Sequence, residues 1–155
     1  MTEDKLLHYT DSIHYELEQT ARLMRILTTQ LFDRLSIELS PDEYSALDTV
    51  SINAGICQRD LAKLILKDRA NTGRILNSLE EKGFITRFID TKNNRLVKKM
   101  GITENGLNEL QKINKKIKGY MDGMTKRISP KEVDSVQQTL KKFRLDLEKA
   151  VNMNI

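Results

Sequence analysis

The 155-residue sequence has one cysteine, two prolines and no tryptophan, and aromatic residues make up only 5% of it. A single cysteine, Cys57, excludes an internal disulfide and fits a protein of the reducing cytoplasm. The N-terminus has no apolar segment typical of a secretory signal, and no apolar run is long enough to span a membrane. We therefore expect a cytoplasmic protein without a membrane segment, whose core consists mainly of Leu, Ile, Val and Met.

Sequence patterns that accompany catalysis or metal binding are also missing. There is no Gly-rich phosphate loop, no HExxH and no CxxC pair. The two histidines, His8 and His14, are six residues apart, whereas side chains on one helix face are three or four residues apart. A metal site there would need ligands from a second element. We therefore expect no enzymatic activity, no bound metal and no cofactor.

Charged residues make up 31% of the chain, and apolar residues recur with helical spacing, which predicts a mainly α-helical protein. Both prolines mark helix starts. In SPDE (40–43) and SPKE (129–132), Ser is placed to cap a helix, Pro to occupy its first position and Glu its third. One helix is therefore expected from Pro41 to about Ser51, and the last helix of the chain is expected to begin at Pro130.

Long amphipathic helices are expected at both ends of the chain. The first extends from Lys5 to about Leu39, bent or broken near its end, and another begins at Thr103. The apolar stripes comprise Leu6, Ile13, Leu17, Met24, Leu27, Leu31 and Leu35 in the first helix, Leu107, Leu110, Ile113, Ile117, Tyr120, Met124 and Ile128 in the second, and Val133, Val136, Leu140, Phe143, Leu147 and Val151 in the last. The last spacing is typical of coiled coils. A partner chain buries such stripes most easily, and a monomeric bundle is the alternative.

The central segment is more basic than the rest of the chain. Residues 56–103 contain 11 Lys and Arg against 5 Asp and Glu, a net charge of +6, whereas the remaining residues carry −2. The pattern predicts helices over 57–66 and 68–82, joined by a very short turn, and then strands over 84–89 and 95–102. Asp68 is placed to cap the second helix and Gly83 to end it. The hairpin tip, Asp90 to Asn94, contains no apolar residue.

Helix, tight turn, helix and basic hairpin, in this order, is the layout of a winged helix-turn-helix. A helix about 10–12 Å in diameter fits the major groove of B-DNA, where its outer side chains reach base edges. Polar residues of the hairpin can follow the phosphate backbone or enter the minor groove. The predicted DNA-binding residues are Arg69, Asn71, Thr72, Arg74 and Asn77 on the helix and Lys92, Asn93, Asn94 and Arg95 on the hairpin.

These residues can also be explained without DNA binding. The polar side chains of 68–82 are also consistent with a solvated helix face, and Arg87 and Arg95 with ion pairs to Asp90. Gly73 lowers helix stability by about 1 kcal/mol relative to Ala, and a close approach of the backbone to a ligand would explain its presence. Spacing and charge together favour DNA contact.

Nearly the whole chain resembles the MarR (multiple antibiotic resistance regulator) family of bacterial transcription factors. The resemblance rests on LSPDEYSALDTV (39–50), CQRDLAKLILKDRANTGRILNSLEEKGFITR (57–87), the pair Asp90 and Arg95, and ITENG (102–106). Three positions depart from the family pattern. Leu66 replaces the usual Gly of the turn, Cys57 replaces a capping Ser or Thr, and Gly101 is expected to form a β-bulge in a longer second wing strand.

The resemblance implies a winged helix-turn-helix domain over 40–103, flanked by dimerisation helices over 1–39 and 104–155. It implies a homodimer on a palindromic operator in double-stranded DNA, with Asp90 structural and Arg95 in contact with DNA. It also implies a repressor released by a small-molecule effector, in this family often anionic and aromatic. The operator, the effector, the target genes and the choice between repression and activation are not specified by the sequence.

Two other functions are consistent with the same residues. One is a winged-helix module that binds proteins and no longer binds DNA. The other is a regulator that senses oxidants through Cys57, because a helix N-terminus stabilises a thiolate and Arg59 is close in the sequence.

Overall fold

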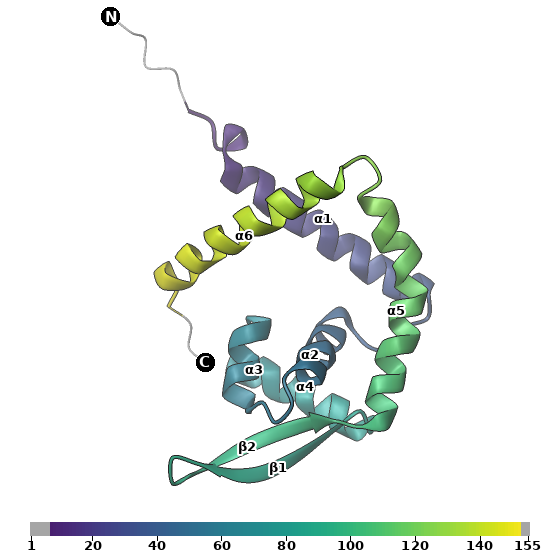
Figure 1. Ribbon diagram of the computed structural model, residues 1–155, viewed down its shortest axis with the longest axis vertical. Coiled ribbons are helices and arrows are strands. Elements are labelled where there is room, and N and C mark those ends of the chain that lie inside the picture. Colours follow the sequence, from purple (N-terminus) through teal and green to yellow (C-terminus); the bar gives the residue numbers. More distant parts are fainter. Residues whose placement is uncertain (1–6, 153–155) are drawn as a thin grey trace, which may run out of the picture. The chain divides into compact units, whose positions relative to one another are not determined.

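The computed structural model describes residues 7–152, and the chain divides into two compact units, one ending at Pro41 and the other beginning at Asp42. Six α-helices, one short 3-10 helix and one two-stranded antiparallel sheet make up the described residues, which confirms the mainly α fold class (Figure 1). The elements are η1 (Tyr9–Asp11), α1 (Ile13–Arg34), α2 (Pro41–Ile52), α3 (Gln58–Ile65), α4 (Arg69–Glu81), β1 (Ile85–Lys92), β2 (Arg95–Ile102), α5 (Glu104–Met124) and α6 (Pro130–Ala150).

The first unit contains a long helix, as expected, although it begins later than the stripe suggests. Ser12 caps α1 by accepting a hydrogen bond from the Tyr15 amide at 3.2 Å. The helix ends at Arg34, and Ser36 has a φ of +53°, which accounts for the expected break before Leu39. Lys5 and Leu6 lie outside the described residues.

Helices α2, α3 and α4 and the base of the hairpin hold the core of the second unit. Leu47 of α2, Leu61 of α3 and Leu76 of α4 are each 0% exposed, and the strands contribute Ile85 and Met100. The carboxylate of Glu43 joins α2 to α4, since it accepts hydrogen bonds from Ser78 at 3.0 Å and from Lys82 at 2.8 Å. The core therefore fixes α4 on one side and leaves its other side to solvent.

The turn between α3 and α4 keeps the left-handed geometry that a glycine would adopt freely. Leu66 has φ +56° and ψ +45°, and its conformation allows the Lys67 amide to bond the Ala62 carbonyl at 3.1 Å. A left-handed conformation costs a non-glycine residue about 1–2 kcal/mol. Leucine in place of the usual glycine at position 66 therefore lowers the stability of the turn but leaves its shape unchanged.

The hairpin differs from expectation in two respects. Its register is continuous from the Ile85–Ile102 pair to the Lys92–Arg95 pair, so the expected five-residue tip is wrong. Only Asn93 and Asn94 form the turn, with φ of +53° and +61°, as in a type I′ turn. Gly101 pairs directly with Thr86 within this register, so the expected β-bulge is absent from the hairpin.

The base of the hairpin is joined to elements on both sides. The Met100 amide donates to the Ile56 carbonyl at 3.0 Å. The backbones of Lys99 and Cys57 form an isolated antiparallel β-bridge. Thr103 caps α5 by accepting from the Gly106 amide at 3.0 Å, and its hydroxyl donates to the Gly83 carbonyl at 2.6 Å. The hairpin thus extends from a fixed base and runs past α3 toward its tip (Figure 1).

The last two helices carry apolar residues that the described chain does not cover. Ile113 and Ile117 of α5 are buried, but Tyr120 and Met124 on the same stripe are each 45% exposed. None of the described residues of α6 is buried, and Leu140 is 38% exposed. The SPKE capping box is confirmed, with Ser129 and Glu132 bonded reciprocally. No helix within residues 7–152 is long and apolar enough to cross a membrane.

Candidate nucleic-acid interface

Helix α4 presents one polar side to solvent. Its apolar residues Leu76 and Leu79 are 0% exposed, whereas Arg69, Arg74 and Asn77 are exposed. Thr72 does not belong to this surface, although we expected it to bind DNA. Its side chain is 0% exposed, and its hydroxyl donates to the Asp68 carbonyl at 2.8 Å, because position 72 shares the inward face with Leu76 and Leu79.

The first turns of α4 carry a chain of polar contacts. Asp68 caps the helix with one carboxylate oxygen, which accepts from the Asn71 amide at 2.7 Å, and its other oxygen accepts from the Asn71 side chain at 2.7 Å. Both bonds lower the pKa of the Asp68 carboxyl, and the bond from the Asn71 backbone amide has the larger effect. The Asn71 side-chain oxygen accepts in turn from Arg74. The Arg74 guanidinium is therefore oriented from within the helix and stays exposed.

Arg87 connects β1 to the outer side of α4. It donates to both oxygens of Glu80, at 2.9 and 3.2 Å, and to the side-chain oxygen of Asn77 at 2.7 Å. Hydrogen bonding by Arg87 lowers the pKa of Glu80, and the same bonds raise the pKa of Arg87. The suggested pairing of Arg87 with Asp90 is therefore absent, because Glu80 takes its place.

Asp90 is bonded within the hairpin. Its carboxylate accepts from Lys99 at 2.9 Å and from the Thr91 amide at 2.7 Å, and the bond from Lys99 lowers its pKa most. No hydrogen bond or ion pair of the Arg95 side chain is found within residues 7–152. Arg95 therefore does not take up the suggested pairing with Asp90.

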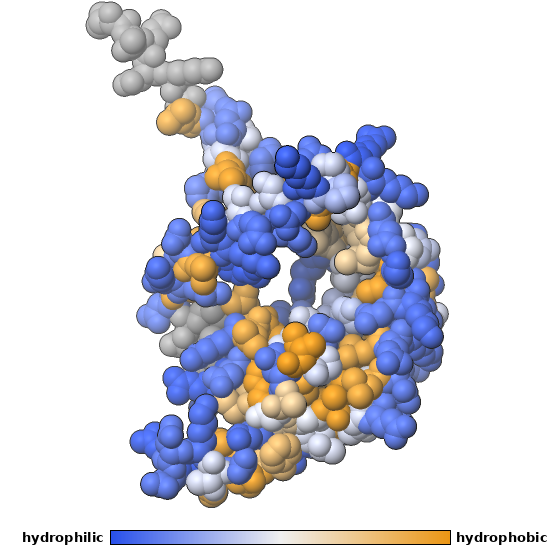
Figure 2. Space-filling model, in the orientation of Figure 1, coloured by the Kyte–Doolittle hydropathy of each residue, from blue (hydrophilic) through white to orange (hydrophobic). Residues whose placement is uncertain are grey.

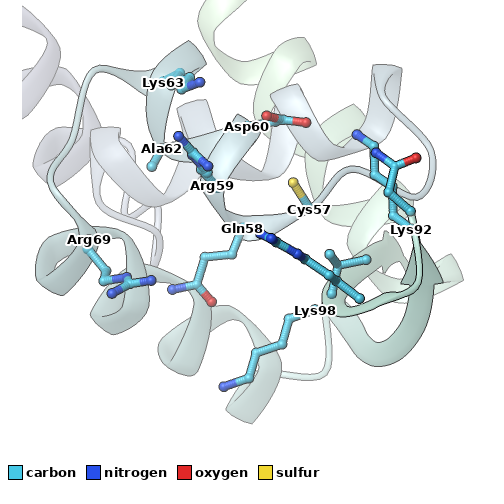
Figure 3. Close-up of a pocket in the computed structure, with 12 residues that line it drawn as sticks. Cys57, Gln58, Arg59, Asp60, Ala62, Lys63, Arg69, Lys92 and Lys98 are labelled. Carbon is cyan, nitrogen blue, oxygen red and sulfur yellow. The ribbon is translucent and has the colours of Figure 1, made fainter. Parts of the chain in front are cut away.

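A cationic cleft lies between α3, the start of α4 and the hairpin. Its volume is about 960 Å³, and six of its lining side chains are Lys or Arg against one Asp. Arg69 lies on one side of it and Lys92 on the other (Figure 3). The lining residues are Cys57, Gln58, Arg59, Asp60, Ala62, Lys63, Arg69, Lys92, Asn93, Arg95, Val97 and Lys98. We call this feature the basic cleft.

The basic cleft unites only some of the predicted residues. Arg69, Lys92, Asn93 and Arg95 line it, whereas Asn71, Arg74, Asn77 and Asn94 do not. Hydrophilic residues cover the tip of the hairpin (Figure 2). Sequence reasoning missed three basic lining residues, Arg59, Lys63 and Lys98, and the amide of Gln58. The only signal for them was the positive charge of 56–103, because their contribution depends on how α3 packs beside the hairpin.

Packing within the chain does not require Gly73. A methyl group there would lie 3.7 Å from the Gln58 side-chain nitrogen, which is an ordinary contact distance. The loss of helix stability at this position is therefore unexplained by the residues around it.

Cys57 occupies the N-cap position of α3 without a capping bond from its side chain. We expect Cys57→Ser to raise the free energy of unfolding by about 0.5–1 kcal/mol, because a hydroxyl caps the exposed amides. Urea denaturation measures this effect. Cys57→Ala is the matched control, since it removes the thiol without supplying a cap, and equal stability of the two variants would contradict the expectation.

Comparison with known proteins agrees with this geometry. Residues 39–97, which span α2, α3, α4 and most of the hairpin, match the model of the MarR family. The HTH-type transcriptional regulator YybA of Bacillus subtilis, itself uncharacterized, is 36% identical over 70 residues, which cover 45% of this chain and 46% of YybA. The chain thus matches about half the length of that curated relative.

Solved structures extend the likeness beyond the matched domain. The crystal structure of the transcriptional regulator SlyA is 28% identical, with a TM-score of 0.74 over 90% of this chain and 96% of SlyA. The Staphylococcus aureus MepR–DNA complex shares the fold at 18% identity, with a TM-score of 0.72 over 90% of this chain and 99% of MepR. The domain match and the overall likeness agree: residues 39–97 match the MarR family, and the chain shares its fold with SlyA and MepR over about nine tenths of its length.

Proposed function

We propose that this protein is a cytoplasmic transcriptional regulator, and not an enzyme, that binds double-stranded DNA as a homodimer. The observation that carries the proposal is the basic cleft beside an exposed, arginine-bearing helix. A helix of this diameter fits the major groove, so Arg74 and Asn77 reach base edges when α4 enters it. The cations of the basic cleft then neutralise phosphates of the flanking DNA backbone. They include Arg69, Lys92 and Arg95.

The exposed stripes of the terminal helices support a dimer. Leu140 and Leu147 of α6, with Met124 of α5, remain 38–45% exposed in the single chain. In the proposal, residues 1–39 and 104–155 form the dimer interface and residues 40–103 bind DNA. A two-fold dimer presents its two α4 helices to half-sites about one helical turn, roughly 10 bp, apart, which corresponds to a palindromic operator.

The proposed mode of control is repression released by a small-molecule effector. The match of residues 39–97 to the MarR family supports this part of the proposal, and no residue of this chain is assigned to the effector. Its chemical class is that expected for the family, a small anionic and often aromatic compound. An effector of this kind lowers DNA affinity when it binds the DNA-free conformation more tightly than the DNA-bound one.

A gel-shift titration tests the proposal with the intact protein and a duplex from upstream of its own operon. A shift that saturates at two chains per duplex, and that resists competition by a scrambled duplex, is the expected result. Absence of any shift at low salt would contradict DNA binding and favour the protein-interaction alternative. Repeating the titration with Cys57→Ser, before and after peroxide, separates a thiol-based response from an effector-based one, since only a thiol sensor loses its response in the variant.

Residues of the hairpin should act on affinity and not on sequence preference. We expect Lys92→Ala to weaken binding to operator and scrambled duplexes by the same factor, because phosphate contacts carry no base information. The slope of log affinity against log salt should fall in magnitude by about 0.9 for each phosphate that a subunit no longer neutralises. Titrations at several salt concentrations measure both effects. Lys112→Ala, an exposed lysine of α5 outside the basic cleft, is the control and should leave the slope unchanged.

A further inference from the structure

The oxygen atoms along the exposed side of α4 already accept hydrogen bonds within the protein. Both carboxylate oxygens of Asp68 accept from Asn71, and both of Glu80 accept from Arg87. The side-chain oxygen of Asn71 accepts from Arg74, and that of Asn77 accepts from Arg87. Each side-chain oxygen of these four residues thus accepts a hydrogen bond from a donor within the protein.

The two arginines also determine the orientation of the two amides. A guanidinium group donates hydrogen bonds and cannot accept them, so it faces the oxygen of each amide and not the nitrogen. Asn77 therefore turns its NH2 group away from Arg87. Arg74 uses one nitrogen on Asn71, and the rest of its donor fork is exposed. Between Asp68 and Glu80, what the exposed side of α4 offers to a ligand is therefore a set of donors, from Arg69, Arg74 and the Asn77 amide nitrogen.

We propose that α4 reads guanine in the major groove and does not read the amino groups of adenine or cytosine. This inference rests on the proposed DNA-binding function and concerns only which bases are recognised. Guanine presents two acceptors in the major groove, O6 and N7, which match the donor fork of an arginine. Adenine and cytosine each present an amino donor there, which requires an acceptor on the protein.

Arg74 and Arg87 have different tasks in this arrangement. Arg74 is the residue assigned to guanine, because its guanidinium is exposed and oriented by Asn71. Arg87 is a positioning residue: its bond to the Asn77 oxygen orients that amide toward β1 and thereby disfavours the bidentate contact with adenine N6 and N7 that an asparagine otherwise makes. Removal of Arg87 frees that oxygen.

The test begins with the intact protein and a random-sequence duplex library. Duplexes retained through rounds of selection should carry a guanine within each half-site, and each guanine is then replaced by 7-deazaguanine or by inosine. 7-Deazaguanine removes the N7 acceptor from the major groove and should lower affinity about tenfold at the guanine read by Arg74. Inosine removes only the minor-groove amino group and should leave affinity within about twofold.

Two variants connect these effects to residues. Arg74→Ala should reduce the preference for guanine over adenine at that position by about 5- to 150-fold, the range for one bidentate base contact, and should abolish the effect of 7-deazaguanine. Arg87→Ala, checked for an unchanged helix signal by circular dichroism, should acquire a preference for adenine at a second position. Selection with Arg87→Ala that returns the wild-type preferences would overturn the role given to Arg87.

Failure of the proposed function and failure of the inference give different results. If no duplex is enriched or retarded, the proposed function itself is wrong. If the protein binds selected duplexes but tolerates 7-deazaguanine at every guanine, DNA binding stands and the inference about guanine is overturned.

Discussion

Gly106→Ala should destabilise the second unit by about 3 kcal/mol or more, at the upper end of what overpacking a tight contact costs. A methyl group at this position would overlap the Phe84 carbonyl oxygen and lie 2.7 Å from a side-chain carbon of Ile102. The carbonyl belongs to the backbone and accepts from the Thr103 amide at 3.0 Å, so it cannot move aside without breaking the start of α5. Urea denaturation followed by circular dichroism measures the loss.

The same helix supplies the control for this prediction. Gly119 also lies in α5, but a methyl group there meets no atom within 4 Å. Gly119→Ala should therefore stabilise the protein by about 1 kcal/mol, the difference in helix propensity between the two residues. Equal effects of the two substitutions would show that the contact with Phe84 is unimportant and that propensity alone governs α5.

Leu140→Glu should convert the proposed dimer into monomers and reduce operator affinity by at least about 100-fold. The substitution places a charge in the middle of the α6 stripe, and burying an unpaired carboxylate in an apolar interface is strongly unfavourable. A monomer contacts one half-site at a time and forgoes the gain from linking two binding sites, which is commonly about 10²–10⁴-fold. Light scattering at micromolar concentration and a gel-shift titration measure the two effects.

Gln138→Glu is the matched control for the dimer prediction. Position 138 lies on the side of α6 opposite the stripe, and the substitution adds the same charge to the same helix. This variant should remain dimeric and bind the operator as the wild type does. A wild-type protein that is already monomeric at micromolar concentration would contradict the proposed assembly directly, and a dimeric Leu140→Glu variant would place the interface elsewhere.

Local signals predicted the helix starts of the second unit well. Asp68, Thr103 and Ser129 each cap a helix by accepting a bond from an amide three residues later, and Gly83 follows α4 with a φ of +76°. A cap depends on a few consecutive residues, so its pattern is readable without knowledge of the fold. Apolar spacing likewise identified the inward face of α4, although Thr72 was wrongly placed on its polar side.

The hairpin turn was harder to predict because its length depends on pairing between strands. Lys92 and Arg95 form the last pair of the register, so Asp90 and Thr91 belong to β1 although they are polar. Asparagine tolerates the left-handed conformation, and two asparagines therefore form the tight turn without glycine. The absence of a bulge at Gly101 follows from the same register, which is set by pairing between strands and not by any short run of residues.

By itself, the sequence determined the fold class, the order of the elements, the basic character of 56–103 and the resemblance to the MarR family. These depend on spacing, caps and charge along the chain. The tertiary structure alone decided the partners of the charged groups: Lys99 for Asp90, Glu80 and Asn77 for Arg87, and a shared cleft for Arg69 and Lys92. Long charged side chains reach several neighbours equally well, so only the packing of α3, α4 and the hairpin selects among them.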